Sequence, residues 1–160
     1  ACDLNAWEVG GRKGSWFSFA DNGINLDFAV RTPPGGWVWQ SCSAVVIGGP
    51  RTSGDKNFAG AGVTLNWPNP YDVSGYTGVR FRLESSLRVW VGIEMTDGGR
   101  FGAFAPASNA VVREIPFSSM TAQADSATST KNLTLAKQFT FTPEDPSMGF
   151  GYLIGEVSLY

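Results

Sequence analysis

The sequence predicts an all-β protein, a two-sheet antiparallel β-sandwich of the jelly-roll type. Short runs of alternating apolar and polar residues end at Gly, Pro, Asn or Asp, and almost no segment has helical periodicity. Aromatic residues make up 13% of the chain and Gly 20 of its 160 residues, which favours strands joined by many turns. Eight or nine such runs are expected to form a single domain covering residues 1–160.

The first three runs each stop at a turn signal. They are residues 15–20, 43–47 and 61–67, followed by Asp-Asn-Gly, Gly-Gly-Pro and Pro. The clearest pair of strands is 78–84 and 88–95, linked by two serines. In the second strand the outward set alternates with a core set and consists of Arg88, Trp90, Gly92 and Glu94. Later strands are expected at 111–117, 138–142 and 151–160. The Ser/Thr/Ala-rich residues 117–137 are expected to form a loop, either without regular structure or with one helical turn.

The charge and composition exclude several functions. The net charge is -2, so the chain has no basic surface of the kind that binds nucleic acid or an anionic membrane. The sequence contains no His, which excludes His-containing triads and His-zinc sites. No apolar run is long enough to span a bilayer.

Two cysteines, Cys2 and Cys42, are expected to form a disulfide in a secreted or cell-surface protein. Two alternatives stay open: both thiols are free, or Cys2 carries a lipid and Cys42 is free. The chain begins without Met and is interpreted as a mature or excised segment of a larger multidomain enzyme.

Four segments, in order along the chain, resemble motifs of one group of secreted bacterial proteins. They are GRKGSWFSFAD at 11–21, PYDVSGYTGVRF at 70–81, IPFSSM at 115–120 and IGEVSLY at 154–160. Together they resemble galactose-binding-like jelly rolls, including the family 11 carbohydrate-binding modules attached to plant-polysaccharide hydrolases. The last segment departs from the family pattern, because Gly155-Glu156 stands where the family has two Asp, and much of residues 32–60 matches no family motif.

The resemblance implies a non-catalytic jelly roll that binds glycan on a concave sheet face or a loop rim, often with a structural calcium ion (Ca²⁺). By the same resemblance, Glu8 and Glu156 occupy the positions of calcium ligands in the first and last strands. The alternative is that both are ordinary surface carboxylates.

Carbohydrate recognition needs flat apolar rings for the C–H faces of sugars and planar polar side chains for their hydroxyls. Trp90 is the leading candidate, because alternation turns it outward between Arg88 and Glu94. A register shifted by one residue, or a covering loop, would bury it instead.

Four further residues are candidates for the binding site. Trp37 and Trp39 either form a stacking platform or place one ring in the core. Tyr71, with Trp67, forms either a rim or the packing of a turn. Arg100 follows an Asp-Gly-Gly turn and is either a loop contact or part of a plain hairpin.

These residues predict a monomeric, non-catalytic module that binds β-glucan or xylan of the plant cell wall and targets an attached glycoside hydrolase. One alternative is a small jelly-roll glycoside hydrolase using Glu94 and Glu114, since such enzymes place paired carboxylates across a cleft. Another is a structural or adhesion module that binds a protein partner.

Overall fold

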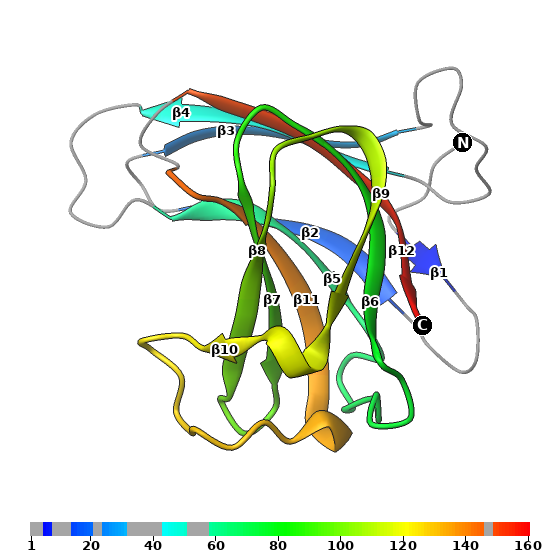
Figure 1. The fold of residues 1–160 in the computed structure, drawn as a ribbon. Helices are drawn as coiled ribbons and strands as arrows, with labels where there is room; N and C mark the ends of the chain where they lie inside the picture. The colour runs from blue at the N-terminus through cyan, green and yellow to red at the C-terminus, as the bar shows by residue number, and fades with distance from the viewer. Residues whose placement is uncertain (1–4, 8–13, 21–23, 32–42, 51–57, 146–148) are drawn as a thin grey trace.

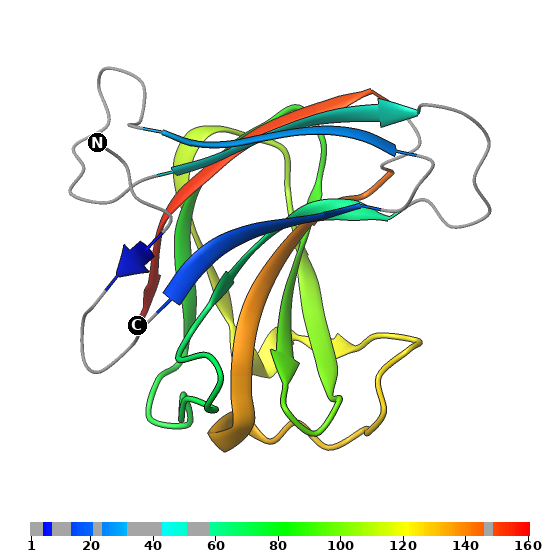
Figure 2. The same ribbon diagram turned by 180° about the vertical axis from the view of Figure 1, so that it is seen from behind.

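The chain folds as two antiparallel sheets. The computed structural model describes residues 5–7, 14–20, 24–31, 43–50, 58–145 and 149–160. One sheet has seven strands in the order β1-β2-β5-β11-β7-β8-β10, and the other has five in the order β3-β4-β12-β6-β9. Figures 1 and 2 show the sheets as two layers, with β3, β4 and β12 lying across β2 and β5. This arrangement confirms the predicted β-sandwich.

The strands of the seven-stranded sheet are β1 (Asn5–Trp7), β2 (Gly14–Ala20), β5 (Ala59–Thr64), β11 (Ala136–Pro143), β7 (Val89–Met95), β8 (Arg100–Ala105) and β10 (Thr121–Ala122). Those of the five-stranded sheet are β3 (Ile24–Arg31), β4 (Ser43–Pro50), β12 (Phe150–Leu159), β6 (Gly78–Ser85) and β9 (Ser108–Pro116). Two short 3-10 turns, η1 (Phe117–Ser119) and η2 (Leu133–Leu135), are the only helical segments in the described ranges. None of them is long and apolar enough to cross a membrane.

The core forms between the sheets from the side chains that point inward on the facing strands. Val89, Val91 and Ile93 on β7 are fully buried. Across the sandwich, the rings of Phe81 on β6 and Phe141 on β11 meet edge to face with centroids 5.6 Å apart. Ring pairs of this kind add about 0.5–1.5 kcal/mol beyond the burial of their area, so they help to fix how the two sheets stack.

A tyrosine hydroxyl also joins the sheets. Tyr152 on β12 is buried, and its hydroxyl crosses to the seven-stranded sheet. There it accepts a hydrogen bond from the backbone N–H of Ala61 at 3.0 Å and donates one to the carbonyl of Phe141 at 2.6 Å. The hydroxyl therefore lies between β5 and β11 and satisfies one backbone group of each strand.

The predicted strands omit β1, β3 and β10. Of the two interpretations of Arg100, the structure confirms the plain hairpin, because β7 and β8 pair across the Asp-Gly-Gly turn. The β3 segment reads INLDFAVR and alternates as clearly as any predicted strand, so its signal was available. The predicted loop 117–137 contains two short helical turns, η1 and η2, where at most one was expected, and the short strand β10. The two residues of β10 pair with β8, and no pattern in the sequence around them predicts this pairing.

Candidate functional site

The side of the seven-stranded sheet that points away from the core, called here the outer face, carries the candidate site. It consists of the residues that alternate, on five neighbouring strands, with the residues whose side chains point into the core. They are Phe17 and Phe19 on β2, Gly60, Gly62 and Thr64 on β5, Gln138, Thr140 and Thr142 on β11, Trp90, Gly92 and Glu94 on β7, and Arg100, Gly102 and Phe104 on β8. Figure 2 shows β2 and β11 of this sheet as curved ribbons.

A row of small residues crosses the middle of the outer face. The strand pairing places Phe17 beside Gly62, Gly62 beside Thr140, Thr140 beside Gly92 and Gly92 beside Gly102. Three of the five members have no side chain. Because a glycine has no side chain, neighbouring side chains can approach the backbone of β5, β7 and β8 closely along this glycine row.

Aromatic rings occupy the space that the glycines leave. A Cβ atom on Gly102 would lie 2.6 Å from Cε2 of Trp90, and one on Gly60 would lie 2.8 Å from Cζ of Phe19. Phe17 packs over Gly62 in the same way. The rings therefore lie close against the sheet, and together they form an apolar surface on it.

Trp90 is turned outward, as alternation predicts, and is half-buried. Its ring meets Phe104 edge to face at a centroid distance of 5.0 Å and an angle of 77°. Its Nε1 atom is buried and has no hydrogen-bond partner among the described residues. Because that nitrogen is the only polar atom of the side chain, the part of Trp90 that a ligand can touch is apolar.

A row of polar side chains runs beside the glycine row. Gln138 donates a hydrogen bond from Nε2 to Glu94 at 2.6 Å, and Arg100 lies 3.8 Å from the same carboxylate. Arg100 also pairs with Asp125 at 2.7 Å. On the other side of Gln138, Thr64 is its direct neighbour on β5. Polar groups held in this way are pre-positioned to hydrogen-bond a ligand.

Arg88 lies at the end of the outer face opposite the row of polar side chains. Its guanidinium lies 4.3 Å from the centroid of the Phe104 ring and pairs with Glu144 at 2.8 Å. The hydrogen bond from Arg88 holds the pKa of the Glu144 carboxyl below its usual value. Among the described residues, the two arginines at the face are paired with carboxylates: Arg88 with Glu144, and Arg100 with Asp125 and, at 3.8 Å, with Glu94.

A hollow of about 270 Å³ extends the face at its β2 and β11 end. It is lined by Ser15, Phe17, Thr64, Trp67, Lys137 and Gln138. Trp67 is 61% exposed, and the Lys137 ammonium lies 5.3 Å from its ring centroid. Of the two interpretations of Trp67, the structure shows an exposed ring beside a hollow.

The structure thus brings four predicted residues together: Trp90, Glu94, Arg88 and Arg100. Tyr71 lies elsewhere, because it pairs with Ala136 and packs, half-buried, against the core. Trp37 and Trp39 lie outside the described residues. The sequence missed Phe17, Phe19, Thr64 and Gln138, although the alternation around buried Trp16 is a signal for the first two.

The alternative hydrolase built on Glu94 and Glu114 is wrong in its geometry. Glu94 lies on the outer face of the seven-stranded sheet, whereas Glu114 lies on β9 and pairs with Arg80 at 2.6 Å on the far side of the five-stranded sheet. The core lies between the two carboxylates, so they cannot act on one glycosidic bond.

The predicted calcium ligands gain no support from the described residues. The Glu156 carboxylate pairs with Arg82 at 3.0 Å, and a guanidinium at that position disfavours a bound cation. No cluster of three or more His, Cys, Asp or Glu suited to a metal occurs in the described ranges. Glu8, Cys2 and Cys42 lie outside those ranges, so calcium and the disulfide stay predictions.

Comparison with solved structures identifies the fold. A family 11 carbohydrate-binding module from Clostridium thermocellum, in complex with a β-1,3-1,4-mixed-linked tetrasaccharide, superposes with a TM-score of 0.68 at 16% identity, covering 99% of this chain and 96% of that one. The chain has the fold of the family 11 carbohydrate-binding modules. This is the jelly roll that the four sequence motifs implied.

Two further modules share this carbohydrate-binding-module fold. The family 11 module of a cellulosomal cellulase of Clostridium thermocellum matches with a TM-score of 0.66 at 15% identity, covering 99% of this chain and 95% of that one. A family 30 module of another cellulosomal cellulase of that organism matches at 0.61 and 10% identity, covering 98% and 96%. No family model and no curated protein matches the sequence.

Proposed function

We propose that this protein is a secreted, non-catalytic carbohydrate-binding module whose outer face binds a neutral β-linked plant polysaccharide, β-glucan or xylan. The observation that carries the proposal is the apolar surface formed by Trp90, Phe17 and Phe19, whose rings lie over glycines of the outer face, together with the row of hydrogen-bonding side chains on the same face. An extended sugar chain has the same two properties, apolar C–H faces and hydroxyl-bearing edges.

The geometry of the rows favours a chain that runs across the strands. Neighbouring strands are about 4.8 Å apart, close to the length of one pyranose unit in an extended β-linked chain. Successive sugars would then meet successive strands from β2 through β5, β11 and β7 to β8. The sugar rings would stack on Phe19 and Trp90, while the edge hydroxyls would bond to Gln138, Glu94 and Arg100.

The pairing of the arginines favours a neutral polymer over an acidic one. Both arginines at the face, Arg88 and Arg100, already hold carboxylate partners. A uronate would have to displace one of those partners, and displacing a paired carboxylate costs the hydrogen bonds it makes. Pectin is therefore expected to bind more weakly than xylan or β-glucan.

Such a module would hold an attached glycoside hydrolase close to its substrate and raise the effective concentration of substrate. The test is affinity gel electrophoresis in mixed-linked β-glucan, xylan, glucomannan and pectin, together with an assay for reducing-sugar release. Retardation by a neutral polymer without sugar release supports the proposal. Release of sugar that is abolished by Glu94→Gln, or retardation by none of the four polymers, would refute it.

A further inference from the structure

The opposite side of the sandwich contains two strained backbone positions. Ala110 on β9 has φ 58° and Glu156 on β12 has φ 48°, and they are the only non-glycine residues with positive φ in the described part of the chain. Each costs about 1–2 kcal/mol relative to an ordinary strand conformation. The strain at Glu156 coincides with a β-bulge, because the pairing of β12 with β6 shifts between Gly155 and Ser158.

Both strained residues hold the same side chain. Arg82, on the strand between them, donates from Nε to the Glu156 carboxylate at 3.0 Å and from Nη1 to the Ala110 carbonyl at 2.9 Å. Only 25% of the Arg82 side chain is exposed. Strain of this kind persists where the surrounding structure fixes it, and bulges often occur where a side chain is re-aimed beside a binding site.

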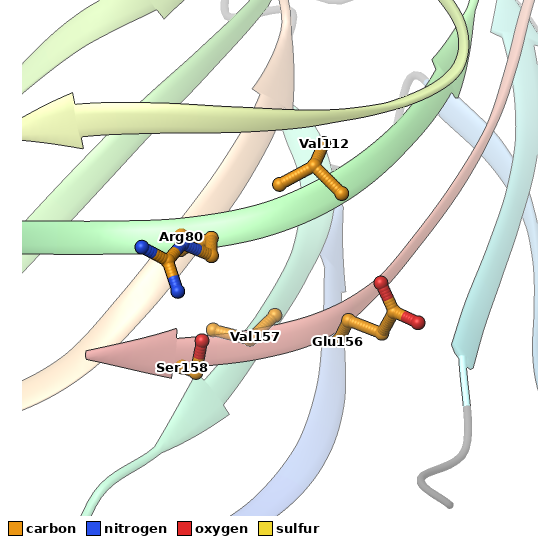
Figure 3. Close-up of a pocket in the computed structure, with 5 residues that line it drawn as sticks. All are labelled: Arg80, Val112, Glu156, Val157 and Ser158. Carbon is orange, nitrogen blue, oxygen red and sulfur yellow. The ribbon is translucent and has the colours of Figure 1, made fainter. Parts of the chain in front are cut away.

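A hollow of about 340 Å³ opens at this point. Its lining comes from three neighbouring strands and consists of Arg80, Val112, Glu156, Val157 and Ser158. Figure 3 shows Val112 and Arg80 on one side, facing Glu156, Val157 and Ser158 on β12. The volume is at the lower end of the range for small-molecule sites, about 300–1,000 Å³, and suits a ligand of one or two rings.

The chemistry of the hollow is polar but without net charge. Arg80 pairs with Glu114 at 2.6 Å, and Arg82 pairs with Glu156. An anion or a cation would have to break one of these pairs, whereas a neutral ligand with several hydroxyls can bond to them as they stand. Val112 and Val157 add apolar surface beside these polar groups.

We infer that this hollow is a second saccharide site, which binds one or two sugar rings on the face opposite the proposed polysaccharide site. The inference shares the ligand class of the proposed function but depends on none of its residues. Two sites on opposite sheets cannot bind adjacent sugars of one extended segment. They would allow one module to hold two polysaccharide chains together.

The experiment is an NMR titration of isotope-labelled protein with the mixed-linked β-glucan tetrasaccharide and with xylohexaose. It uses a Trp90→Ala background, which weakens the outer face. Saturable shifts of the Val112 and Ser158 amides, with a Kd on the order of 1 mM, are expected for a site of this size. Val112→Phe fills the hollow and should weaken this binding at least about tenfold.

Val111→Phe is the matched control. Val111 and Val112 are adjacent on β9 and 42% and 44% exposed, but only Val112 lines the hollow. Equal effects of the two substitutions would overturn the inference, as would the absence of saturable shifts with both sugars. Ser158→Phe fills the hollow from β12 and decides the matter if Val112→Phe fails to fold. Failure of the proposed function looks different, because the wild-type amides of β7 and β8 would not respond while those of the hollow still did.

Discussion

Removal of the Trp90 side chain tests the proposed site directly. Trp90→Ala loses the edge-to-face contact with Phe104, worth about 0.5–1.5 kcal/mol, and the burial of half a large ring, worth about 2 kcal/mol. The free energy of unfolding should therefore fall by about 2–4 kcal/mol. A chain of 160 residues has about 5–15 kcal/mol, so the variant stays folded, with a Tm lower by roughly 5–15 °C.

The Trp90→Ala variant should also bind the polymer more weakly than the wild type, even under conditions where both proteins are fully folded. A central aromatic anchor contributes about 2 kcal/mol or more to binding, which corresponds to about a 30-fold increase in Kd. Isothermal titration calorimetry against the best neutral polymer measures this change at a temperature where the variant is folded. Trp90→Phe keeps an aromatic ring on the glycine row and should lose only about fivefold.

Tyr76→Ala is the matched control for this experiment. Tyr76 is also an exposed aromatic residue, but the loop that holds it ends beside β12 of the five-stranded sheet, where the Thr77 N–H donates to the Tyr160 carbonyl. The Tyr76→Ala variant should bind the polymer with the same Kd as the wild type. The reasoning is refuted if folded Trp90→Ala binds within about twofold of wild type, since the apolar surface would then not be what the ligand contacts.

Three further predictions concern the packing and charge around the site. Tyr152→Phe leaves two buried backbone groups without a partner and should lower the free energy of unfolding by about 2–5 kcal/mol; an unchanged denaturation midpoint would contradict this. Gly102→Ala places a Cβ 2.6 Å from both the Trp90 ring and the Val91 carbonyl oxygen, so it should alter the near-ultraviolet circular dichroism and weaken binding about tenfold, whereas an unchanged spectrum with full affinity would show that this close packing is dispensable. The pKa of Glu144 is lowered by Arg88 from its ordinary 4.5, so the pair stabilises the fold above that pH and loses its effect as the pH falls through the lowered value; Glu144→Gln should remove this part of the acid dependence of Tm, and identical pH profiles would count against it.

Alternation along single strands predicted the core faces and the central part of the candidate site. The buried set Val89, Val91 and Ile93 and the outward set around Trp90 both follow from the period of two. These features are local, because each depends on one run of the sequence. The same rule applied to residues 24–31 would have found β3.

The order of the strands in the two sheets could not be predicted from the sequence. Phe17, Gly62 and Thr140 are neighbours in one row, yet they come from three distant parts of the chain. Pairing of this kind is decided by the packing of whole sheets. For the same reason the position of Glu114 in the sandwich could not be predicted. Glu94 and Glu114 were a possible catalytic pair by their residue type, but they lie on opposite surfaces.

Glycines inside strands were the signal most easily overlooked. Glycine is usually read as a turn residue, but Gly62, Gly92 and Gly102 lie within strands and matter for what they leave empty. Their role emerges only when the neighbouring ring is known. The same holds for Glu156, whose left-handed backbone in the middle of a strand has no signature in sequence.

Because of the glycine row, some positions of the outer face should tolerate substitution much better than others. A substitution at Gly62 or Gly102 adds atoms beneath a ring, and one at Gly92 adds atoms against the Thr140 hydroxyl. A change of a side chain that stands above the sheet disturbs the backbone less, and such side chains are Phe17, Phe19, Phe104 and Gln138. A library for new ligand specificity should therefore keep the glycines constant and randomise those four positions. The selected variants would keep the same sheet backbone and differ only in the few side chains that contact the sugar. A change of specificity should therefore require few mutations.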